Sequence, residues 1–374
     1  MMPSEPKHRE ISRQLLSEIA GGKYEAEGRL PSEAQLVSRF HVSRPTVARA
    51  LRDLQAEGLI ERRAGSGTYV RRQAPGSAST RQLGLLIPGL GTTEIFELIC
   101  GEIASLARAS EYSLLWGGSS HPRQDQDDSL EHAEELCKQF IERRVTGVFF
   151  APFELTPGKE DAHRQIAERF REAGIPVLLL DRDLTPFPHR SNFDLVGLDN
   201  VAAGFLLAEH LIKLGCRHLA FVARPLSAPT VDGRIAGVRE ALARHHLELV
   251  PDWVRIGDPQ DVKFVRSLLA GRSWDAVLCA NDFTAAHLLR TCEQIHFRVP
   301  QDVRVAGFDD AKYATLVRVP LTTIQQPCRD LAITAFSAML QRVAEPALPV
   351  RTLLLAPRLV VRESCGAYLQ PKGR

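Results

Sequence analysis

The sequence lacks closely spaced cysteines. Its seven cysteines are odd in number and widely scattered over 374 residues, with no Cys-x-x-Cys pair and no Cys/His ligand spacing. Disulfide frameworks and structural metal sites need such spacings. We therefore expect reduced, packed thiols and no metal site.

Long apolar runs are missing as well. The longest, at 148–152 and 177–180, are far too short to span a bilayer. The first residues, MMPSEPKHREISRQ, are polar and show no secretory signal pattern. These observations predict a cytoplasmic protein.

Catalytic motifs that can be recognised by their spacing are also absent from the sequence. There is no Gly-x-Ser-x-Gly elbow and no His-Glu-x-x-His. Gly89, Leu90 and Gly91 begin like a dinucleotide-binding loop, but the third glycine is missing and no Gly-Lys-Ser/Thr follows. We expect neither an enzyme nor a bound cofactor.

Length and charge show how the chain is divided. The length favours two or three domains, and 44% hydrophobic with 25% charged residues is typical of globular proteins. Residues 1–73 hold 13 Lys/Arg against 9 Asp/Glu, whereas the remainder holds 34 against 36. The basic N-terminal part is therefore the candidate nucleic-acid face. Residues 71–82, RRQAPGSASTRQ, have the composition of a linker after it.

The N-terminal part predicts two helices ahead of a tight turn. Ile11, Leu15 and Ile19 are spaced four apart, which favours a helix over 10–20. Ser32 and Gln35 form a capping-box pattern at the start of a second helix. A turn follows at 40–42.

A third helix is expected to read DNA. Ser43 is a suitable N-cap, and Pro45 falls in the first turn, where its missing N–H costs little. Arg44, Thr46 and Arg49 lie off the apolar stripe near the helix start, which is the part of a recognition helix that contacts bases. The segment LIERRAGSGTYV then predicts two short strands around a glycine-rich tip, which is the order of a winged helix-turn-helix.

This part resembles the GntR family of bacterial regulators. LPSEAQL, VSRPTVARAL and EGLIERRAGSGTYV are close to that family's consensus, apart from Ala34 and Ala48. The resemblance implies contacts with DNA from Ser32, Ser43, Arg44, Pro45, Thr46, Arg49, Arg63, Gly65, Ser66, Gly67 and Thr68.

The larger part alternates short apolar runs with amphipathic stretches, which predicts parallel sheets covered by helices on both faces. It is longer than a domain with a single hydrophobic core usually is, so we expect two α/β lobes. The strands are expected at 83–87, 113–116, 147–151, 177–180, 195–198, 218–222, 276–279 and 303–307. The predicted fold class is thus α/β, with an N-terminal winged helix-turn-helix and a two-lobed parallel α/β domain.

Polar residues follow several of these strands, where ligands of open α/β sheets bind. Carboxylates, amides, Arg and an aromatic wall together suit a polyhydroxyl ligand. A strand-end Asp such as Asp282 or Asp310 can instead cap the next helix. Glu154 can be an ordinary loop residue, and Arg234 a surface ion pair.

The segments VGLDNVAAGFLLAEHLIKLGCRHLAFV, GRIAGVREAL, WDAVLCANDFTAAHLL, VPQDVRVAGFDDAKYA and PLTTIQQP resemble the effector domain of LacI-type repressors and periplasmic sugar-binding proteins. The resemblance implies a periplasmic-binding-protein-like fold. The candidate ligand-binding residues are Thr93, Glu94, Phe96, Glu154, Asp181, Arg182, Arg234, Asn281, Asp309 and Gln326.

With both parts in one chain, the protein is similar to the arabinose-responsive GntR regulators. We expect a DNA-binding domain at 7–73, a linker at 74–81, an effector-binding and dimerisation domain at 82–366, and a tail at 367–374. The predicted function is a homodimeric repressor of a near-palindromic operator, controlled by a small sugar. The alternatives are an activator, a sensor of a non-sugar metabolite, or a GntR head fused to an enzyme-like domain.

Overall fold

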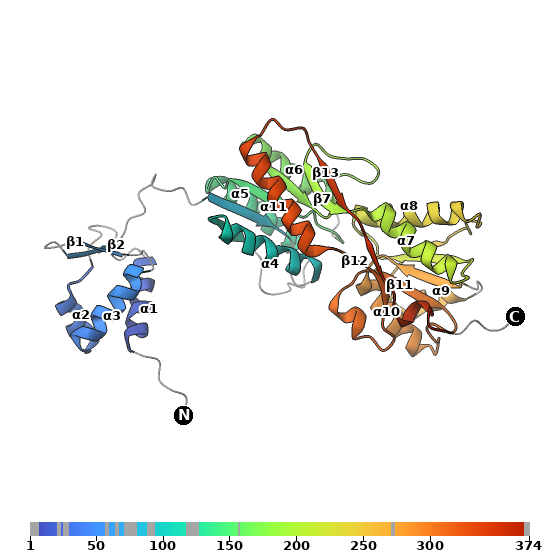
Figure 1. The fold of residues 1–374 in the computed structure, drawn as a ribbon, viewed down its shortest axis with the longest axis horizontal. Helices are drawn as coiled ribbons and strands as arrows, with labels where there is room; N and C mark the ends of the chain where they lie inside the picture. The colour runs from blue at the N-terminus through green and yellow to red at the C-terminus, as the bar shows by residue number, and fades with distance from the viewer. Residues whose placement is uncertain are drawn as a thin grey trace, which may run out of the picture. The chain divides into compact units, whose positions relative to one another are not determined.

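The computed structural model divides the chain into two compact units, residues 1–79 and 80–374 (Figure 1). Each unit has its own buried apolar core. The structure describes residues 7–20, 24, 30–56, 60–63, 67–70, 81–87, 94–116, 127–155, 158–270 and 274–369.

The first unit is a three-helix bundle followed by a β-hairpin. Its elements are α1 (Lys7–Ala20), α2 (Glu33–Phe40), α3 (Arg44–Ala56), β1 (Ile60–Arg63) and β2 (Gly67–Val70). One apolar residue per turn of each helix points inward, so Leu15, Leu36 and Leu51 are completely buried in one core. His41 adopts a left-handed conformation at the end of α2, which makes the sharp turn into α3.

The second unit contains two lobes, each built on a six-stranded sheet. In lobe 1 the strand order is β13-β7-β6-β5-β3-β4, and every neighbouring pair is parallel. The strands are β3 (Arg81–Leu86), β4 (Tyr112–Trp116), β5 (Gly147–Phe150), β6 (Val177–Leu180), β7 (Asp194–Leu198) and β13 (Thr352–Leu355).

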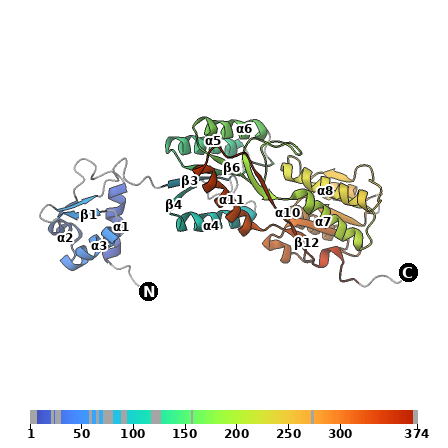
Figure 2. The same ribbon diagram turned by 45° about the horizontal axis from the view of Figure 1, so that its top comes forward.

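Helices cover both faces of the lobe 1 sheet, with α4 and α11 on one face and α5 and α6 on the other (Figure 2). The strands are consequently apolar on both sides: Phe149 packs in the core below α4, and Phe150 in the core below α5. These helices are α4 (Glu94–Ala109), α5 (Asp127–Glu142), α6 (Lys159–Glu172) and α11 (Cys328–Ala344).

Lobe 2 repeats this plan in the order β14-β12-β11-β10-β8-β9, with only β14 antiparallel to its neighbour. Its strands are β8 (Leu219–Ala223), β9 (Val254–Ile256), β10 (Ala276–Cys279), β11 (Arg304–Asp309), β12 (Thr322–Gln325) and β14 (Arg358–Val360). Its helices are α7 (Asn200–Lys213), α8 (Pro229–Arg244), α9 (Val262–Leu269) and α10 (Asp282–Gln294), with short 3₁₀ turns at Lys312–Thr315 and Glu363–Cys365.

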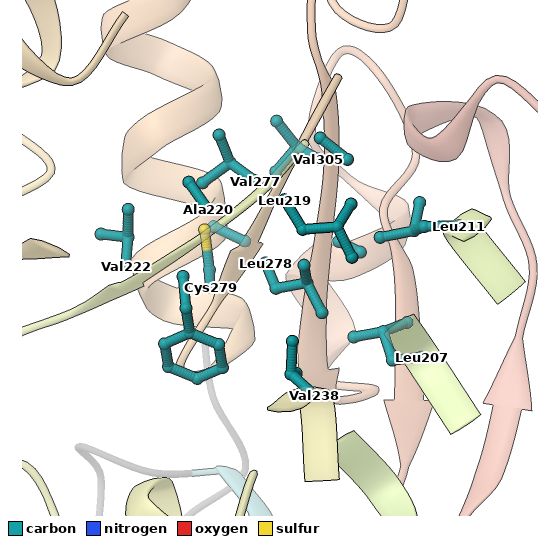
Figure 3. Close-up of a cluster of buried hydrophobic side chains, with 14 of the residues drawn as sticks. Leu207, Leu211, Leu219, Ala220, Val222, Val238, Val277, Leu278, Cys279 and Val305 are labelled. Atoms are coloured by element: carbon teal, nitrogen blue, oxygen red, sulfur yellow. The ribbon is translucent and has the colours of Figure 1, made fainter. Parts of the chain in front are cut away.

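One continuous apolar core holds lobe 2 together (Figure 3). Leu207 and Leu211 of α7 and Val238 of α8 face the side chains of the central strands β8 and β10, and all of these side chains are buried. The predicted α/β class with two parallel-sheet lobes is confirmed.

The chain passes between the lobes three times, from β7 to α7, from β12 to α11 and from β13 to β14. In both sheets the strand order reverses beside the first strand, between β3 and β5 in lobe 1 and between β8 and β10 in lobe 2. Ligands of such sheets bind outside the carboxyl ends of the strands at these reversals, and several of the predicted polar residues lie there.

Candidate functional site

The start of α3 presents polar side chains on the surface of the first unit. The Ser43 carbonyl accepts hydrogen bonds from the amides of Thr46 (3.0 Å) and Val47 (3.3 Å), which begins the helix. The Ser43 and Thr46 hydroxyls lie 2.8 Å apart and share a hydrogen bond. Three further predicted DNA contacts are exposed on this helix, namely Arg44, Pro45 and Arg49.

Arg44 is held only loosely within the protein. Its side chain is 80% exposed, and its Nε lies 3.4 Å from the Glu33 carboxylate of α2. An exposed ion pair of this kind contributes about 0–1 kcal/mol and is screened by salt. The guanidinium can therefore exchange this partner for a base or phosphate at small cost.

Ser32 forms the capping box that the sequence predicts. Its hydroxyl accepts from the Gln35 amide at 3.3 Å, and the Gln35 side-chain oxygen accepts from the Ser32 amide at 2.8 Å. The cap fixes the entry of α2, and Ser32 itself stays exposed beside the positive end of that helix.

The β-hairpin has the geometry of a wing. Arg63 pairs with Gly67 in the antiparallel register, and Gly67 has φ of 126°, a conformation that other residues rarely adopt. The Leu30 amide donates to the Thr68 carbonyl at 2.9 Å, which ties the hairpin to the helical core. Gly65, Ser66 and the side chain of Arg63 lie outside the described residues.

A second group of predicted residues meets where the two lobes face each other. We call it the interlobe cluster. Lobe 1 contributes the residues that follow β5 and β6, and lobe 2 contributes one residue of α8 and two at the ends of β11 and β12. The members are Glu154, Asp181, Arg182, Arg234, Asp309 and Gln326.

Arg182 organises the lobe 1 half of the cluster. It is 4% exposed, and its guanidinium lies 3.2 Å from the Glu154 carboxylate and 3.1 Å from that of Asp181. Burial alone raises the pKa of Glu154, but Arg182 and Arg234 outweigh this effect and hold that pKa below its ordinary value. Glu154 is therefore a charged carboxylate and not a plain loop residue. The Arg182 guanidinium also lies over the Phe96 ring, 5.3 Å from its centroid.

Arg234 organises the lobe 2 half. It is 4% exposed, so the alternative of a surface ion pair is wrong. Its Nε donates to the Asn200 side chain at 2.8 Å, a second nitrogen donates to the Ala280 carbonyl, and a third lies 3.7 Å from Asp309. The Phe308 ring supports the guanidinium from below, 4.7 Å from its centroid. Contacts from three sides fix the direction of this cation.

Asp309 is a carboxylate with unusual proton affinity. Burial raises its pKa to about 6, with Arg234 and Gln326 opposing the rise and the carboxylates of Asp181 and Glu154 adding to it. The Gln326 amide donates to Asp309 at 2.8 Å. Asp309 can thus accept a further hydrogen bond in its ionised form and donate one when protonated.

Two acceptor atoms of the cluster are buried without a hydrogen-bond partner among the described residues. They are Oδ1 of Asp181 and Oε1 of Gln326. Arg182 also leaves Nε and Nη1 without a well-aligned hydrogen bond, although both lie at ion-pair distance from carboxylates. Buried polar atoms are almost always satisfied, so this group is equipped to bind a ligand that both donates and accepts hydrogen bonds.

The remaining predicted ligand residues have structural contacts. Asn281 caps α10, because its side-chain oxygen accepts from the Thr284 amide at 2.9 Å. Glu94 accepts a hydrogen bond from the Lys312 amide of lobe 2, and Phe96 is buried beneath Arg182. Thr93 lies outside the described residues.

Neither Asp282 nor Asp310 is the helix cap that the sequence allowed. Asp282 is completely buried and accepts from the Thr323 hydroxyl at 2.6 Å and the Ala311 amide at 3.0 Å. Asp310 accepts from Gln325 and Arg362. Both carboxylates therefore fix the loops that hold Asp309.

Sequence reasoning missed three residues next to the cluster. Asn200 positions Arg234, Lys159 is a buried lysine that reaches lobe 2, and Tyr313 is half-buried with a pKa raised by burial and by the nearby Asp309. Only Asn200 had a signal, since it lies in the quoted LDN segment after a strand. Within the described ranges, no group of three His, Cys, Asp or Glu residues could hold a metal ion, and no helix is long and apolar enough to cross a membrane.

Two family models match the chain. The model of the gntR family of bacterial regulatory proteins matches residues 7–70, and that of the periplasmic binding protein-like domain matches residues 208–365. The first match contains the capped α2, the α3 start and the wing. The second contains Arg234, Asp309 and the end of lobe 2.

Known proteins combine or share these parts. An arabinose metabolism transcriptional repressor of Geobacillus stearothermophilus is 26% identical over 373 residues, covering 96% of this chain and 97% of the relative. A solved complex of the transcriptional regulator CelR with cellobiose has a TM-score of 0.64 at 23% identity, covering 86% of this chain and 91% of that one. The lac repressor dimer bound to operator and the anti-inducer ONPF has a TM-score of 0.62 at 23% identity, covering 77% and 95%.

These relatives are transcriptional regulators and not enzymes, so the alternative of a DNA-binding head fused to an enzyme-like domain is wrong. The likeness to the solved structures extends over both lobes of the second unit. The chain is therefore a transcriptional regulator that joins a GntR-type DNA-binding domain to a LacI-like, periplasmic-binding-protein-like domain.

Proposed function

We propose that this regulator represses transcription as a cytoplasmic homodimer on a near-palindromic operator and is released by a small, neutral carbohydrate bound at the interlobe cluster. In this proposal residues 7–73 bind DNA, and residues 74–81 link them to the second domain. Residues 82–366 bind the effector and dimerise, and residues 367–374 form a tail. Support comes from the relative named for arabinose metabolism and the solved complex with cellobiose.

The observation that carries the carbohydrate proposal is the set of buried acceptors without partners, Asp181 Oδ1 and Gln326 Oε1, beside the Arg182 and Arg234 guanidinium groups. A hydroxyl group donates a hydrogen bond to the carboxylate or amide oxygens and accepts one from the guanidinium groups. A fully ionised phosphate or carboxylate group has no hydrogen to donate, so it would leave both acceptors unsatisfied. A polyhydroxyl ligand satisfies the whole set.

The DNA-binding residues are proposed from the first unit. Arg44 and Arg49 would contact bases or phosphates, with Ser43, Pro45 and Thr46 at the helix start against the backbone. Ser32 and the wing residues Arg63, Gly65, Ser66, Gly67 and Thr68 would contact the flanking phosphates. Support comes from the exposure of the α3 start and the weak partner of Arg44.

A homodimer would account for both operator recognition and release by the effector. Two identical heads related by a twofold axis would read the two half-sites of a palindrome. Effector bound between the lobes would favour one arrangement of the three interlobe connections, and the energy for release would come from the difference in effector affinity between the two arrangements.

The test combines a sugar screen with operator binding. Pentoses, hexoses and deoxy-sugars are added to the purified protein, and thermal unfolding identifies binders because a ligand of the native state raises Tm. The binder is then titrated into the protein–operator complex, where we expect operator affinity to fall. Asp181→Asn and Gln326→Ala should lose the sugar effect, whereas Asp252→Asn, on the exposed surface of lobe 2, should keep it. A panel in which no sugar alters either Tm or operator affinity would refute the carbohydrate effector.

A further inference from the structure

Lys159 is a buried lysine that joins the two lobes. It is the first residue of α6 in lobe 1 and is 4% exposed. Its Nζ donates to the Leu226 carbonyl at 2.6 Å and lies 3.3 Å from the Ser227 carbonyl, and both carbonyls belong to the loop between β8 and α8 in lobe 2. An ammonium group is costly to bury without such partners, so this contact explains why a lysine occupies the position.

A second bond reinforces the same point of contact. The Leu155 amide of lobe 1 donates to the Leu226 carbonyl at 2.8 Å, so one carbonyl of lobe 2 accepts from two groups of lobe 1. Leu155 and Leu226 both have φ of 59°, in the left-handed region that a leucine rarely adopts. The Leu226 side chain is 48% exposed. The exposed side chain adds little to the contact, so Leu226 contacts lobe 1 mainly through its backbone carbonyl.

The contact lies next to the interlobe cluster on both sides. Leu155 directly follows Glu154, and α8 begins at Pro229, three residues after Leu226, and carries Arg234. Lys159 also lies close enough to Glu154 and Arg182 to interact with their charges. The contact therefore sets the register between the Glu154 loop of lobe 1 and the Arg234 helix of lobe 2.

We propose that Lys159 is a positioning residue. Together with Leu155 and the carbonyls of Leu226 and Ser227 it forms an interlobe latch that holds the two halves of the cluster in their effector-binding arrangement. The latch is a property of the chain itself, while its effect on effector affinity rests on the proposed function. Opening the latch lowers the fraction of molecules that can bind the effector, and the apparent effector affinity falls by the same factor.

Distance measurement between spin labels tests the latch without any effector. The seven native cysteines are all buried and free, so labels can be directed to Lys138→Cys on α5 and Arg244→Cys on α8, both at exposed positions. We expect Lys159→Met to add a longer interlobe distance population, and Lys159→Arg to keep the original one. Lys263→Met, at an exposed lysine of lobe 2, is the matched control. An unchanged distance distribution in Lys159→Met would overturn the latch.

A second pair of variants tests the carbonyl side, and keeps the proposal testable if Lys159→Met does not fold. Leu226→Pro cannot adopt the φ of 59° and turns the carbonyl away, whereas Leu226→Gly adopts it without strain. We expect the longer distance in Leu226→Pro and the original distance in Leu226→Gly. Equal distributions in these two variants would contradict the role of the Leu226 carbonyl.

The effect on affinity is measured with the sugar that raises the Tm of the wild type. We expect Lys159→Met and Leu226→Pro to weaken sugar binding by about tenfold or more without weakening operator binding, because each substitution removes two hydrogen bonds between the lobes. Altered distances with unaltered sugar affinity would show that Lys159 does not position the cluster. If no sugar binds the wild type, the carbohydrate proposal fails, and the spin-label distances still decide whether the latch exists.

Discussion

Gly204 of α7 touches the backbone of Arg234 in α8, so closely that a β-carbon at position 204 would lie 2.0 Å from the Arg234 carbonyl oxygen. Gly237, one turn further along α8, approaches the Val201 carbonyl of α7 to the same extent. Only glycine allows the two helices this separation. The depth at which Arg234 enters the interlobe cluster therefore depends on a residue that has no side chain.

Gly204→Ala should displace α8 and with it Arg234. We expect a loss of about 1–3 kcal/mol in unfolding free energy from overpacking, together with weaker effector binding and unchanged operator binding. Thermal and denaturant unfolding, calorimetric titration of the effector and operator binding provide the measurements. Gly101→Ala is the matched control, because its β-carbon would meet nothing within 4 Å on the exposed face of α4, and it should be neutral or slightly stabilising. Equal effects of the two substitutions would contradict the positioning role.

Effector binding should depend on pH through Asp309. Burial raises its pKa to about 6, above the value of about 4 for an unfolded Asp. Ionising Asp309 therefore costs stability as the pH rises between these two values. A hydroxyl that donates to the carboxylate favours the ionised form, so effector affinity should rise between about pH 5 and 7. Calorimetric titrations across this range measure the effect. Asp309→Asn should flatten the profile, and a flat wild-type profile would show that the effector does not contact ionised Asp309.

Arg44→Ala should remove specific operator binding without harming the fold. Loss of a bidentate base contact costs about 1–3 kcal/mol of discrimination, whereas the exposed pair with Glu33 adds little to stability. An operator recovered by in vitro selection from random duplexes, with affinity read by fluorescence anisotropy, provides the assay. Arg52→Ala, exposed later on α3, should have a smaller effect. A sequence-selective footprint retained by Arg44→Ala would refute the recognition-helix assignment.

Asp194→Ala should strongly destabilise lobe 1. The buried carboxylate accepts from Arg342 at 2.9 Å through both oxygens and from the Arg351 amide at 2.8 Å, joining β7 to the ends of α11 and β13. Removing one partner of a buried ion pair costs about 3–5 kcal/mol. Denaturant unfolding at neutral pH measures this loss.

The same carboxylate predicts a pH effect. Burial alone raises the pKa of Asp194, but Arg342 and Arg351 outweigh it and lower that pKa. The stabilisation is therefore present above the ordinary carboxyl pKa and is lost as the pH falls through the lowered value. The gap in stability between wild type and Asp194→Ala should shrink in acid. A gap that stays constant would assign the effect to packing alone.

Eight strands of the second unit are visible in the sequence, because each contains a short apolar run between amphipathic stretches or turn signals. The strands β9, β12, β13 and β14 were not predicted. They have only three or four residues, and β13 alternates between exposed and half-buried positions and ends two residues before Pro357. Such segments become strands through partners far away in sequence, as Leu353 does beside Val196, and a local pattern cannot contain that information.

The residues of the candidate site also include some that the sequence predicts and others that it does not. Asp181, Arg182 and Asp309 follow predicted strands, and the rule that polar strand ends meet is enough to nominate them. Gln326 follows the unpredicted β12, and only the resemblance of its segment PLTTIQQP to LacI-type effector domains nominated it. The burial of Lys159 depends on carbonyls 67 and 68 positions away, in the other lobe. Nothing in the flanking sequence distinguishes it from a surface lysine.

The three passages of the chain between the lobes also determine the order in which the protein is completed during synthesis. The first unit uses only residues before position 80 and can fold as soon as it leaves the ribosome. Lobe 1 lacks α11 and β13 until the last tenth of the chain is made, and lobe 2 waits equally long for β14. A growing or C-terminally shortened chain thus carries a complete first unit while both lobes of the second unit still lack edge strands, so the two units become complete at different times.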